Sequence, residues 1–496
     1  MQEFKLPQLI KISDQKKKPK ILLLSDDLRL FSGIAAMSRE FVVGTTDKFD
    51  WVQLGAALEH PDHGKVIDIS KAVEDETNIL GASVKIYAHT GYGNPAVLRE
   101  ILSIENPDVI LHFTDPRFWG WLYSMEYELR VKRKIPISYY NIWDCPPAPL
   151  WNEPFYRSCD LIMNISKQTH QLVKLVLGQK SFRDEKLSEG VGNIKISHVS
   201  HGINEDKFFP ITPESKDYED FKKFSDKFKE DNKCEFIVFW NNRNIRRKQP
   251  GDVILAFKNF CDRLHKPQAS KCLLFMHTHI QDENGTDLYA VREVCCPDHK
   301  IIFSEARIDD RTLNFFYNLS SITLNIASNE GFGLSGAESI MAGTPIINNV
   351  TGGLQDQCGF VENINEEWVP MEFDNNFTSN HTGKIKKHGK WAFPVFPSNR
   401  SLQGSLATPY IFDDRCSFED VADALMESWQ LRESLKLRGM EGRDFALSNK
   451  SNMSAKAMCK GISDNISNLI ETFIPPKRIR LIDTNNTKKH NGIVWK

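Results

Sequence analysis

The stretch 322–347 constrains the fold of this chain more than any other part of it. It opens with an apolar run, residues 322–327, whose β-branched side chains suit a strand buried in a parallel sheet. Gly331 and Gly333 then free the backbone for a tight turn. A short helix is predicted over 334–341, and a second apolar run follows it. Strand, glycine turn, helix and strand in this order predict an α/β fold with a parallel sheet.

Two glutamates flank the turn. Glu330 lies directly before it, and Glu338 lies eight residues further on, inside the predicted helix. The unpaired N–H groups at a helix N-terminus carry partial positive charge, so they bind phosphate. A phosphate cradle with a carboxylate on each side suits a ligand that has a diphosphate in the middle and hydroxyl-bearing sugars at both ends. Such a ligand is a nucleotide sugar.

These residues resemble the donor-site motif of retaining glycosyltransferases of the GT-B fold, of the family four type. The motif has two glutamates separated by seven residues, and in this chain the first is followed by Gly331, Phe332, Gly333 and Leu334. The resemblance implies that Glu330 faces the transferred sugar, that the four amides after it face the diphosphate, and that Glu338 binds the nucleotide ribose. An ordinary strand, turn and helix with two surface glutamates is the alternative.

The resemblance also implies the architecture. A GT-B protein has two Rossmann-like, doubly wound domains that face a cleft, and a C-terminal helix that crosses back to the first domain. The turn at 201–204 is similar to the one that closes the N-terminal domain in this family. The predicted parts are a leader (1–19), an N-terminal acceptor-side domain (20–205), a C-terminal nucleotide-sugar-binding domain (206–454, with an insertion at about 361–415), and a crossover helix with a basic tail (455–496).

Composition excludes several classes of protein. The chain of 496 residues is long enough for two or three domains. Its net charge of -2 gives no overall field that favours nucleic acid or an anionic membrane. The ten cysteines have no regular spacing, which favours neither a zinc site nor a disulfide framework. The polar N-terminus lacks a signal peptide, and no apolar run approaches the ~20 residues of a membrane span. We therefore expect a soluble, cytoplasmic protein.

In the N-terminal domain, a glycine and two titratable residues are candidates for the site. Gly33 follows the first predicted strand, where the resembled family has a glycine loop near the donor phosphates and the acceptor; a plain helix start is the alternative. The family often has a histidine after the strand that ends at Phe113, and Thr114 takes that position in this chain. Either Asp115 or His112 approaches the sugar, or neither does. We prefer Asp115 because it lies at the end of the strand.

In the C-terminal domain, Arg243 and Lys248 match the family's diphosphate-binding pair, just past the first strand of that domain. A basic surface loop is the alternative, and nucleic-acid contact by Arg246 and Arg247 is a further hypothesis. No Asp-x-Asp metal motif is convincingly placed, since the adjacent aspartate pairs suit caps or turns. The sequence therefore predicts neither a metal nor a cofactor, with the nucleotide sugar as co-substrate.

The acceptor does not follow from these residues. Segments 25–40 and 114–119 also resemble glycosyltransferases of large tailed phages, some of which modify hydroxymethylated bases in DNA. Modified duplex DNA is then one candidate acceptor, and the protein would act in the cytoplasm of the host cell. A surface polysaccharide or a lipid-linked glycan is the other. The loop 141–151, rich in proline and tryptophan, either stacks on a sugar or base or is a packed connector. A catalytically silent nucleotide-sugar-binding protein is the alternative of another class.

Overall fold

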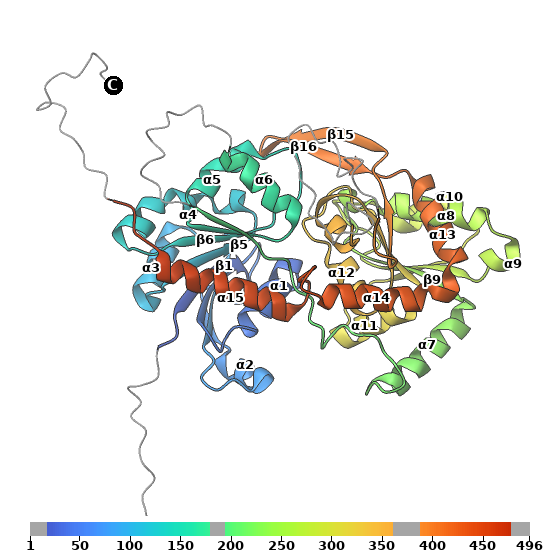
Figure 1. Cartoon of the computed structure of the whole chain (residues 1–496), viewed down its shortest axis with the longest axis horizontal. Coiled ribbons are helices and arrows are strands. Elements are labelled where there is room, and N and C mark those ends of the chain that lie inside the picture. Colours follow the sequence, from blue (N-terminus) through green and yellow to red (C-terminus); the bar gives the residue numbers. More distant parts are fainter. Residues whose placement is uncertain (1–16, 179–193, 361–386, 478–496) are drawn as a thin grey trace, which may run out of the picture.

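Two sheets organise the molecule. The structure is a computed structural model, and it describes residues 17–178, 194–360 and 387–477. Most of the predicted leader, residues 361–386 of the predicted insertion and the tail after 477 lie outside the described residues. Figure 1 shows the two α/β domains beside one another, with the C-terminal helices running along both.

The first sheet has eight strands in the order β3-β4-β2-β1-β5-β6-β7-β8. All neighbours are parallel except β3 and β4, which are antiparallel. Its strands are β1 (Lys20–Asp26), β2 (Asp50–Ala57), β3 (Val66–Asp68), β4 (Val84–Thr90), β5 (Val109–Phe113), β6 (Ile137–Asn141), β7 (Leu161–Asn164) and β8 (Lys195–His198).

Both faces of this sheet are covered, and β1 shows why. Ile21 and Leu23 point into one apolar core, and Leu22 and Leu24 point into another. The covering helices and helical turns are α1 (Gly33–Val43), α2 (Ser70–Thr77), α3 (Pro95–Glu105), η2 (Pro116–Trp119), α4 (Gly120–Ser124), η3 (Tyr127–Lys132), η4 (Leu150–Asn152), α5 (Glu153–Arg157) and α6 (Lys167–Gly178).

The second sheet has six strands, all parallel, in the order β11-β10-β9-β12-β13-β14. They are β9 (Phe236–Asn241), β10 (Cys272–His277), β11 (Ile301–Ser304), β12 (Ile322–Asn325), β13 (Ile346–Asn349) and β14 (Ala392–Val395). The helical elements are α7 (Tyr218–Asn232), η6 (Arg246–Lys248), α8 (Pro250–Asp262), α9 (Lys266–Ala269), α10 (Leu288–Cys295), α11 (Asp310–Leu319), α12 (Leu334–Met341), η7 (Gly352–Gln357), α13 (Phe418–Gln430), η8 (Arg432–Ser434), α14 (Leu435–Leu447) and α15 (Ala455–Thr472).

The segment predicted as an insertion has two roles. Its strand β14 pairs with β13 and extends the main sheet. The following strands β15 (Asn399–Ser405) and β16 (Thr408–Arg415) form a separate antiparallel hairpin. In Figure 1 this hairpin lies at the top of the molecule, above both domains.

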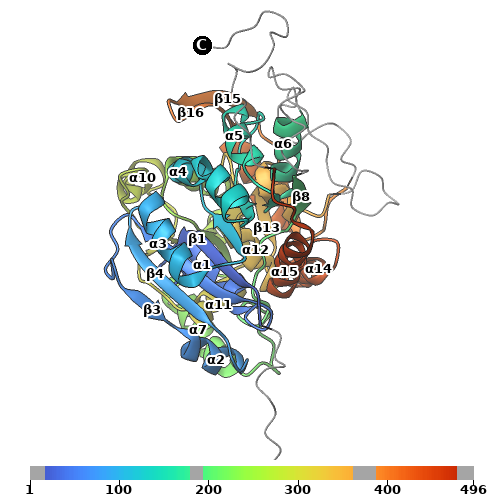
Figure 2. The same ribbon diagram turned by 90° about the vertical axis from the view of Figure 1, so that its left-hand side faces the viewer.

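The last helix returns to the first domain. α15 packs on α1, where the Cys459 side chain lies so close to Gly44 that a Cβ on that glycine would be 2.5 Å from its sulfur. The chain enters α15 beside the first interdomain connection, since Ile203 donates to the carbonyl of Met453 (2.8 Å) and Ala455 donates to that of Ile203 (2.9 Å). Figure 2 shows α14 and α15 next to one another at one side of the molecule. Among the described helices, none is long and apolar enough to span a membrane.

We predict that G202A destabilises the protein. A Cβ on Gly202 would lie 2.5 Å from the Ser454 carbonyl oxygen and 2.6 Å from Ala455 Cα, so backbone must move. Overpacking of this kind lowers the free energy of unfolding by about 1–3 kcal/mol, which urea denaturation would measure.

The matched control is G251A. A Cβ there meets no atom of the described residues within 4 Å, and the site is in helix α8. Alanine should leave stability unchanged or raise it by at most about 1 kcal/mol. Equal effects of the two substitutions would contradict the close packing at the interdomain connection.

Candidate functional site

The carboxyl ends of the two sheets face each other. Gly33 begins α1 just after β1, and Leu334 begins α12 just after β12. A Cβ on Gly33 would lie 3.3 Å from Leu334 Cδ1, so the two helix N-termini meet across the domain interface. Open α/β sheets bind ligands at this edge, outside the carboxyl ends of their strands.

Two glycine turns interlock at this edge. Gly353 donates from its backbone N–H to the carbonyl oxygen of Glu330 (2.9 Å). A Cβ on Gly352 would lie 1.9 Å from that same oxygen, and one on Gly353 would lie 2.3 Å from the carbonyl oxygen of Gly331. Gly333 has φ +87°, in the left-handed region that favours glycine. A side chain at Gly352 or Gly353 would displace the backbone of the Glu330 turn, so this contact requires glycine at both positions.

The Glu330 carboxylate lies between two cations, and 12% of its side chain is exposed. Its Oε2 accepts from Arg247 Nη1 (3.0 Å) and is also in contact with Lys248 Nζ. Burial alone would raise the pKa of Glu330, but the charges of Lys248 and Arg247 outweigh it and hold that pKa at about 2. Burial lowers the pKa of Lys248 despite the nearby carboxylate. The cluster concentrates positive charge beside the glycine turn.

The second glutamate of the motif has the opposite environment. Glu338 Oε2 accepts a hydrogen bond from the Tyr317 hydroxyl (2.6 Å), and that hydroxyl accepts from Asn241 Nδ2 (3.0 Å). Burial is the largest cause of its pKa shift, and it raises the pKa of Glu338 to about 7. The two motif glutamates therefore differ strongly in proton affinity.

The N-terminal domain adds backbone and side chains to the same place. A Cβ on Gly331 would lie 2.9 Å from Ile165 Cδ1 and 3.8 Å from Asp144 Cβ. Burial lowers the pKa of Arg247, but the charge of Glu330 and, less strongly, that of Asp144 raise it above its usual value. The ring of Phe332 lies 5.4 Å from that of His201, both buried. The loop after β6 thus lies directly against the motif.

The two N-terminal candidates differ in position. His112 is fully buried, and its ring stacks on that of Tyr139. Its Nδ1 shares a hydrogen bond with the Tyr123 hydroxyl (2.7 Å). Burial lowers its pKa to about 3, so it is a neutral core residue. Asp115 lies at the end of β5 as expected, held by Arg117 through Nε (2.9 Å). His112 therefore lies in the core, whereas Asp115 lies just past the carboxyl end of the strand.

The structure does not bring Arg243 together with Lys248. Its guanidinium pairs with Asp282 (2.8 Å), and 60% of its side chain is exposed. The neighbouring Asn244 is fully buried and donates to the carbonyls of Ile280 (3.0 Å) and Thr286 (2.7 Å), which turns the loop so that Arg247 reaches the motif instead. The arginine that lies beside Lys248 at the motif is Arg247, four residues further along the chain.

Sequence reasoning missed Arg247 and Asp144 as members of the cluster. Arg247 lies in the basic run 243–248, in which the resemblance pointed to Arg243 instead. Asp144 lies in the proline- and tryptophan-rich loop, which was noticed for its aromatic residues only. Proximity of this loop to the glycine turn is a tertiary contact, and no local pattern encodes it.

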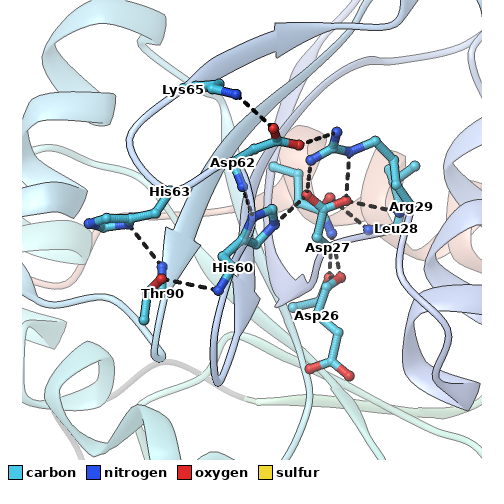
Figure 3. A network of polar contacts seen from close by, with 11 residues as sticks. Asp26, Asp27, Leu28, Arg29, His60, Asp62, His63, Lys65 and Thr90 are labelled. Carbon is cyan, nitrogen blue, oxygen red and sulfur yellow. Dashed lines mark hydrogen bonds and ion pairs between the residues drawn. The ribbon is translucent and has the colours of Figure 1, made fainter.

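A second polar network lies in the segment that leads from β1 to Gly33. Figure 3 shows buried Asp27 between Arg29 (2.7 Å) and His60 (3.0 Å), with Arg29 also bonded to Asp62 (3.0 Å). The Asp26 side chain points away from this network and accepts from Ser32 Oγ (2.7 Å). The adjacent aspartates thus shape the turn between β1 and α1. Within the described ranges, no group of three His, Cys, Asp or Glu side chains gathers as a metal-ligand set.

No protein-family model matches the sequence, and no curated protein matches it. Solved structures do match. The chain is similar to Anabaena Alr3699/HepE in complex with UDP and glucose, at 11% identity and a TM-score of 0.59, over 91% of this chain and 100% of that one. It is similar to sucrose-phosphate synthase from Thermosynechococcus elongatus, at 13% identity and a TM-score of 0.59, over 92% and 100%.

A glycosyltransferase from Rickettsia africae ESF-5 is similar too, at 16% identity and a TM-score of 0.57, over 92% of this chain and 100% of that one. These matches span both sheets. The chain has the GT-B fold. In this GT-B chain, the crossover helix is α15, and the interlocked glycine turns lie where the two domains meet.

We predict that Glu338→Gln stabilises the protein at neutral and alkaline pH. A carboxyl whose pKa is raised on folding, from 4.5 to about 7, favours the folded state at low pH and loses that contribution as pH rises through 7. Glutamine carries no charge and still accepts from Tyr317. The difference in melting temperature between variant and wild type should grow from pH 5 to pH 7 and then level off. A difference that does not change with pH would contradict the raised pKa.

Proposed function

We propose that this protein is a retaining glycosyltransferase that moves a sugar from a nucleoside-diphosphate sugar to an acceptor hydroxyl. The observation that carries the proposal is the charged cluster of Glu330, Arg247 and Lys248 at the glycine turn of a GT-B fold. Fixed cations and helix amides together suit the diphosphate of a donor. The HepE structures with UDP, and with UDP-glucose, support a donor of this class.

The donor roles divide among the motif residues. Arg247, Lys248 and the amides of residues 331–334 bind the diphosphate. Glu338 accepts from the ribose hydroxyls, for which its carboxylate is placed beside the Tyr317 hydroxyl. Glu330 orients the transferred sugar. Gly33 lets the first helix approach the donor because it carries no side chain.

The proposed reaction needs no nucleophile from the protein. The bond between the sugar's anomeric carbon and the diphosphate oxygen breaks, and the acceptor oxygen bonds to that carbon on the same face. The acceptor's proton passes to the departing diphosphate oxygen. Charge builds on that leaving group, and preorganised donors at such a place are worth about 10²–10³ in rate each. We propose that the fixed cations supply this stabilisation without a metal ion.

The acceptor enters from the side of Asp115 and the loop after β6. Two acceptors remain proposals: hydroxymethylated bases in phage DNA, in a host cytoplasm, and a glycan on a surface polysaccharide or lipid carrier. A nucleotide-sugar-binding protein without catalysis is the alternative function, and release of nucleoside diphosphate separates the two, because a binding protein releases none.

The deciding experiment measures nucleoside diphosphate release by the purified protein. The donors are UDP-, GDP- and ADP-sugars, each with and without duplex DNA that contains hydroxymethylcytosine, and with neutral oligosaccharides. Release that rises with modified DNA identifies a DNA-modifying transferase. Release that rises with an oligosaccharide identifies a glycan acceptor. Binding without release from any donor would overturn the transferase in favour of a binding protein.

We predict opposite effects of Glu330→Gln on binding and on transfer. The carboxylate and a diphosphate compete for the same two cations, so removing its charge should tighten nucleoside diphosphate binding. Transfer should fall by roughly 10²-fold, because the sugar loses its orienting group. Calorimetry and product release measure the two effects, and Glu433→Gln, on a residue with 92% of its side chain exposed, is the control. Weaker binding in Glu330→Gln would contradict the competition.

The two arginines provide a matched pair. Arg247→Ala should weaken nucleoside diphosphate binding by about 10–100-fold, the loss of a charged hydrogen bond. Arg243→Ala should change binding by less than about 2-fold, since its guanidinium pairs with Asp282 away from the cluster. A larger loss of binding in Arg243→Ala than in Arg247→Ala would instead support Arg243 and Lys248, the pair that the sequence predicted. Melting temperatures of both variants control for loss of fold.

A further inference from the structure

The β15–β16 hairpin contacts both domains at the site. On the C-terminal side it is bonded to the segment that leads into Glu330. Asp413 Oδ1 accepts from Ser328 Oγ (3.1 Å) and Asn329 Nδ2 (2.9 Å), and the backbone N–H of Asp414 donates to the Ser328 carbonyl (3.0 Å). Asn329 in turn accepts from Arg247 Nη1 at its carbonyl oxygen (2.7 Å). One carboxylate thus holds the two residues immediately before the catalytic candidate.

The same hairpin holds the second glycine turn. Asp414 Oδ2 accepts from Thr351 Oγ1 (3.0 Å), and its Oδ1 accepts from Arg400 Nε (2.9 Å) across the hairpin. Asp414 is almost fully buried, and Asn349 also donates to its carbonyl oxygen (2.8 Å). Adjacent aspartates therefore fix the starts of both interlocked turns.

On the N-terminal side, the hairpin rests on the loop after β6. Phe412 donates from its backbone N–H to the Pro146 carbonyl (2.8 Å). The Tyr410 ring lies 4.4 Å from that of Trp151, and its hydroxyl contacts the Ala148 carbonyl at 3.3 Å. Ile411 packs against the buried cluster that contains Trp143. Along β16, the residues that make these contacts lie within four positions of Asp413 and Asp414, which hold the segment before Glu330.

We propose that Asp413 is a positioning residue for Glu330, and that the hairpin makes this position depend on the seating of the acceptor-side loop on β16. This inference rests on the proposed function, since it concerns the placement of the proposed sugar-orienting carboxylate. Phe412 is bonded to Pro146, and Asp414, two residues later, is bonded to Ser328. Because both residues belong to a strand that is paired with β15, a shift of the loop is passed on to Ser328. Glu330 is then in its reactive place only while Phe412 is bonded to Pro146.

The kinetic test compares Asp413→Ala with Asp413→Asn. Alanine removes the acceptor of both hydrogen bonds, and a small misplacement of a reacting group lowers the rate of transfer by roughly 10-fold or more. Nucleoside diphosphate binding should stay within about 2-fold, because Arg247 and Lys248 are unchanged. Asparagine keeps a carbonyl oxygen that accepts the same bonds, so it should restore most of kcat. Leu406→Ala, at the fully exposed hairpin tip, is the control.

A rate for Asp413→Ala equal to that of wild type would overturn the proposal. Equal loss in the alanine and asparagine variants would overturn it too, because the charge and not the position would then matter. A parallel loss of binding would indicate general damage to the donor site and would also count against a positioning role.

A second measurement does not need activity. Hydrogen exchange of the segment 408–415 reports the interdomain bond of Phe412 and the bond of Asp414. Tyr410→Ala should speed exchange in 408–415 and also in 328–333, with global stability little changed. Faster exchange confined to 408–415 would show that the hairpin does not transmit to Glu330. If no donor supports transfer, the proposed function fails, and this exchange result still decides the coupling.

Discussion

The contact between the two glycine turns is the constraint on which the site depends. A carbonyl oxygen of Glu330 lies where Gly352 would carry its Cβ, so one turn occupies the side-chain space of the other. The hydrogen bond from Gly353 fixes the pair in register. Because β12 and β13 are neighbours in a parallel sheet, their turns emerge at the same edge, and the sheet supplies the alignment. The rigid backbone then determines where the Glu330 side chain can go.

That side chain loses most of its contact with water, which is unfavourable for an isolated carboxylate. Two cations offset the loss of hydration, and the sum is a low pKa instead of a protonated acid. Glu338 also loses much of its contact with water, but its partner is the neutral hydroxyl of Tyr317, so desolvation prevails and its pKa rises. The same residue type, eight positions apart on one short segment, thus has two protonation behaviours, and the neighbours alone cause the difference.

Local patterns predicted much of this fold. The helices that begin at Gly33 and Leu334 start at the predicted residues, because a glycine turn after an apolar run leaves little choice. The sequence analysis assigned strand β14 to an insertion, because its place at the sheet edge depends on pairing with β13, far away in sequence.

The directions of side chains in loops were the least predictable feature. Asn244 is held by two distant carbonyls, and this turns the loop so that Arg247 and not Arg243 faces the site. His112 was left open between core and site, and the central position of β5 places its ring among aromatic side chains.

The two chain crossings between the domains have a mechanical consequence. Residues 203 and 453–455 are bonded to each other, so both crossings pass through one small region instead of two separated ones. A pair of connections at one point acts as a single pivot. The hairpin lies well away from α14 and α15 in both views, so it is the part of the domain interface far from this pivot. A rotation of a few degrees about the pivot therefore displaces the ends of β15 and β16 more than any part of the interface close to the crossings, and the farthest contact is the one that separates first.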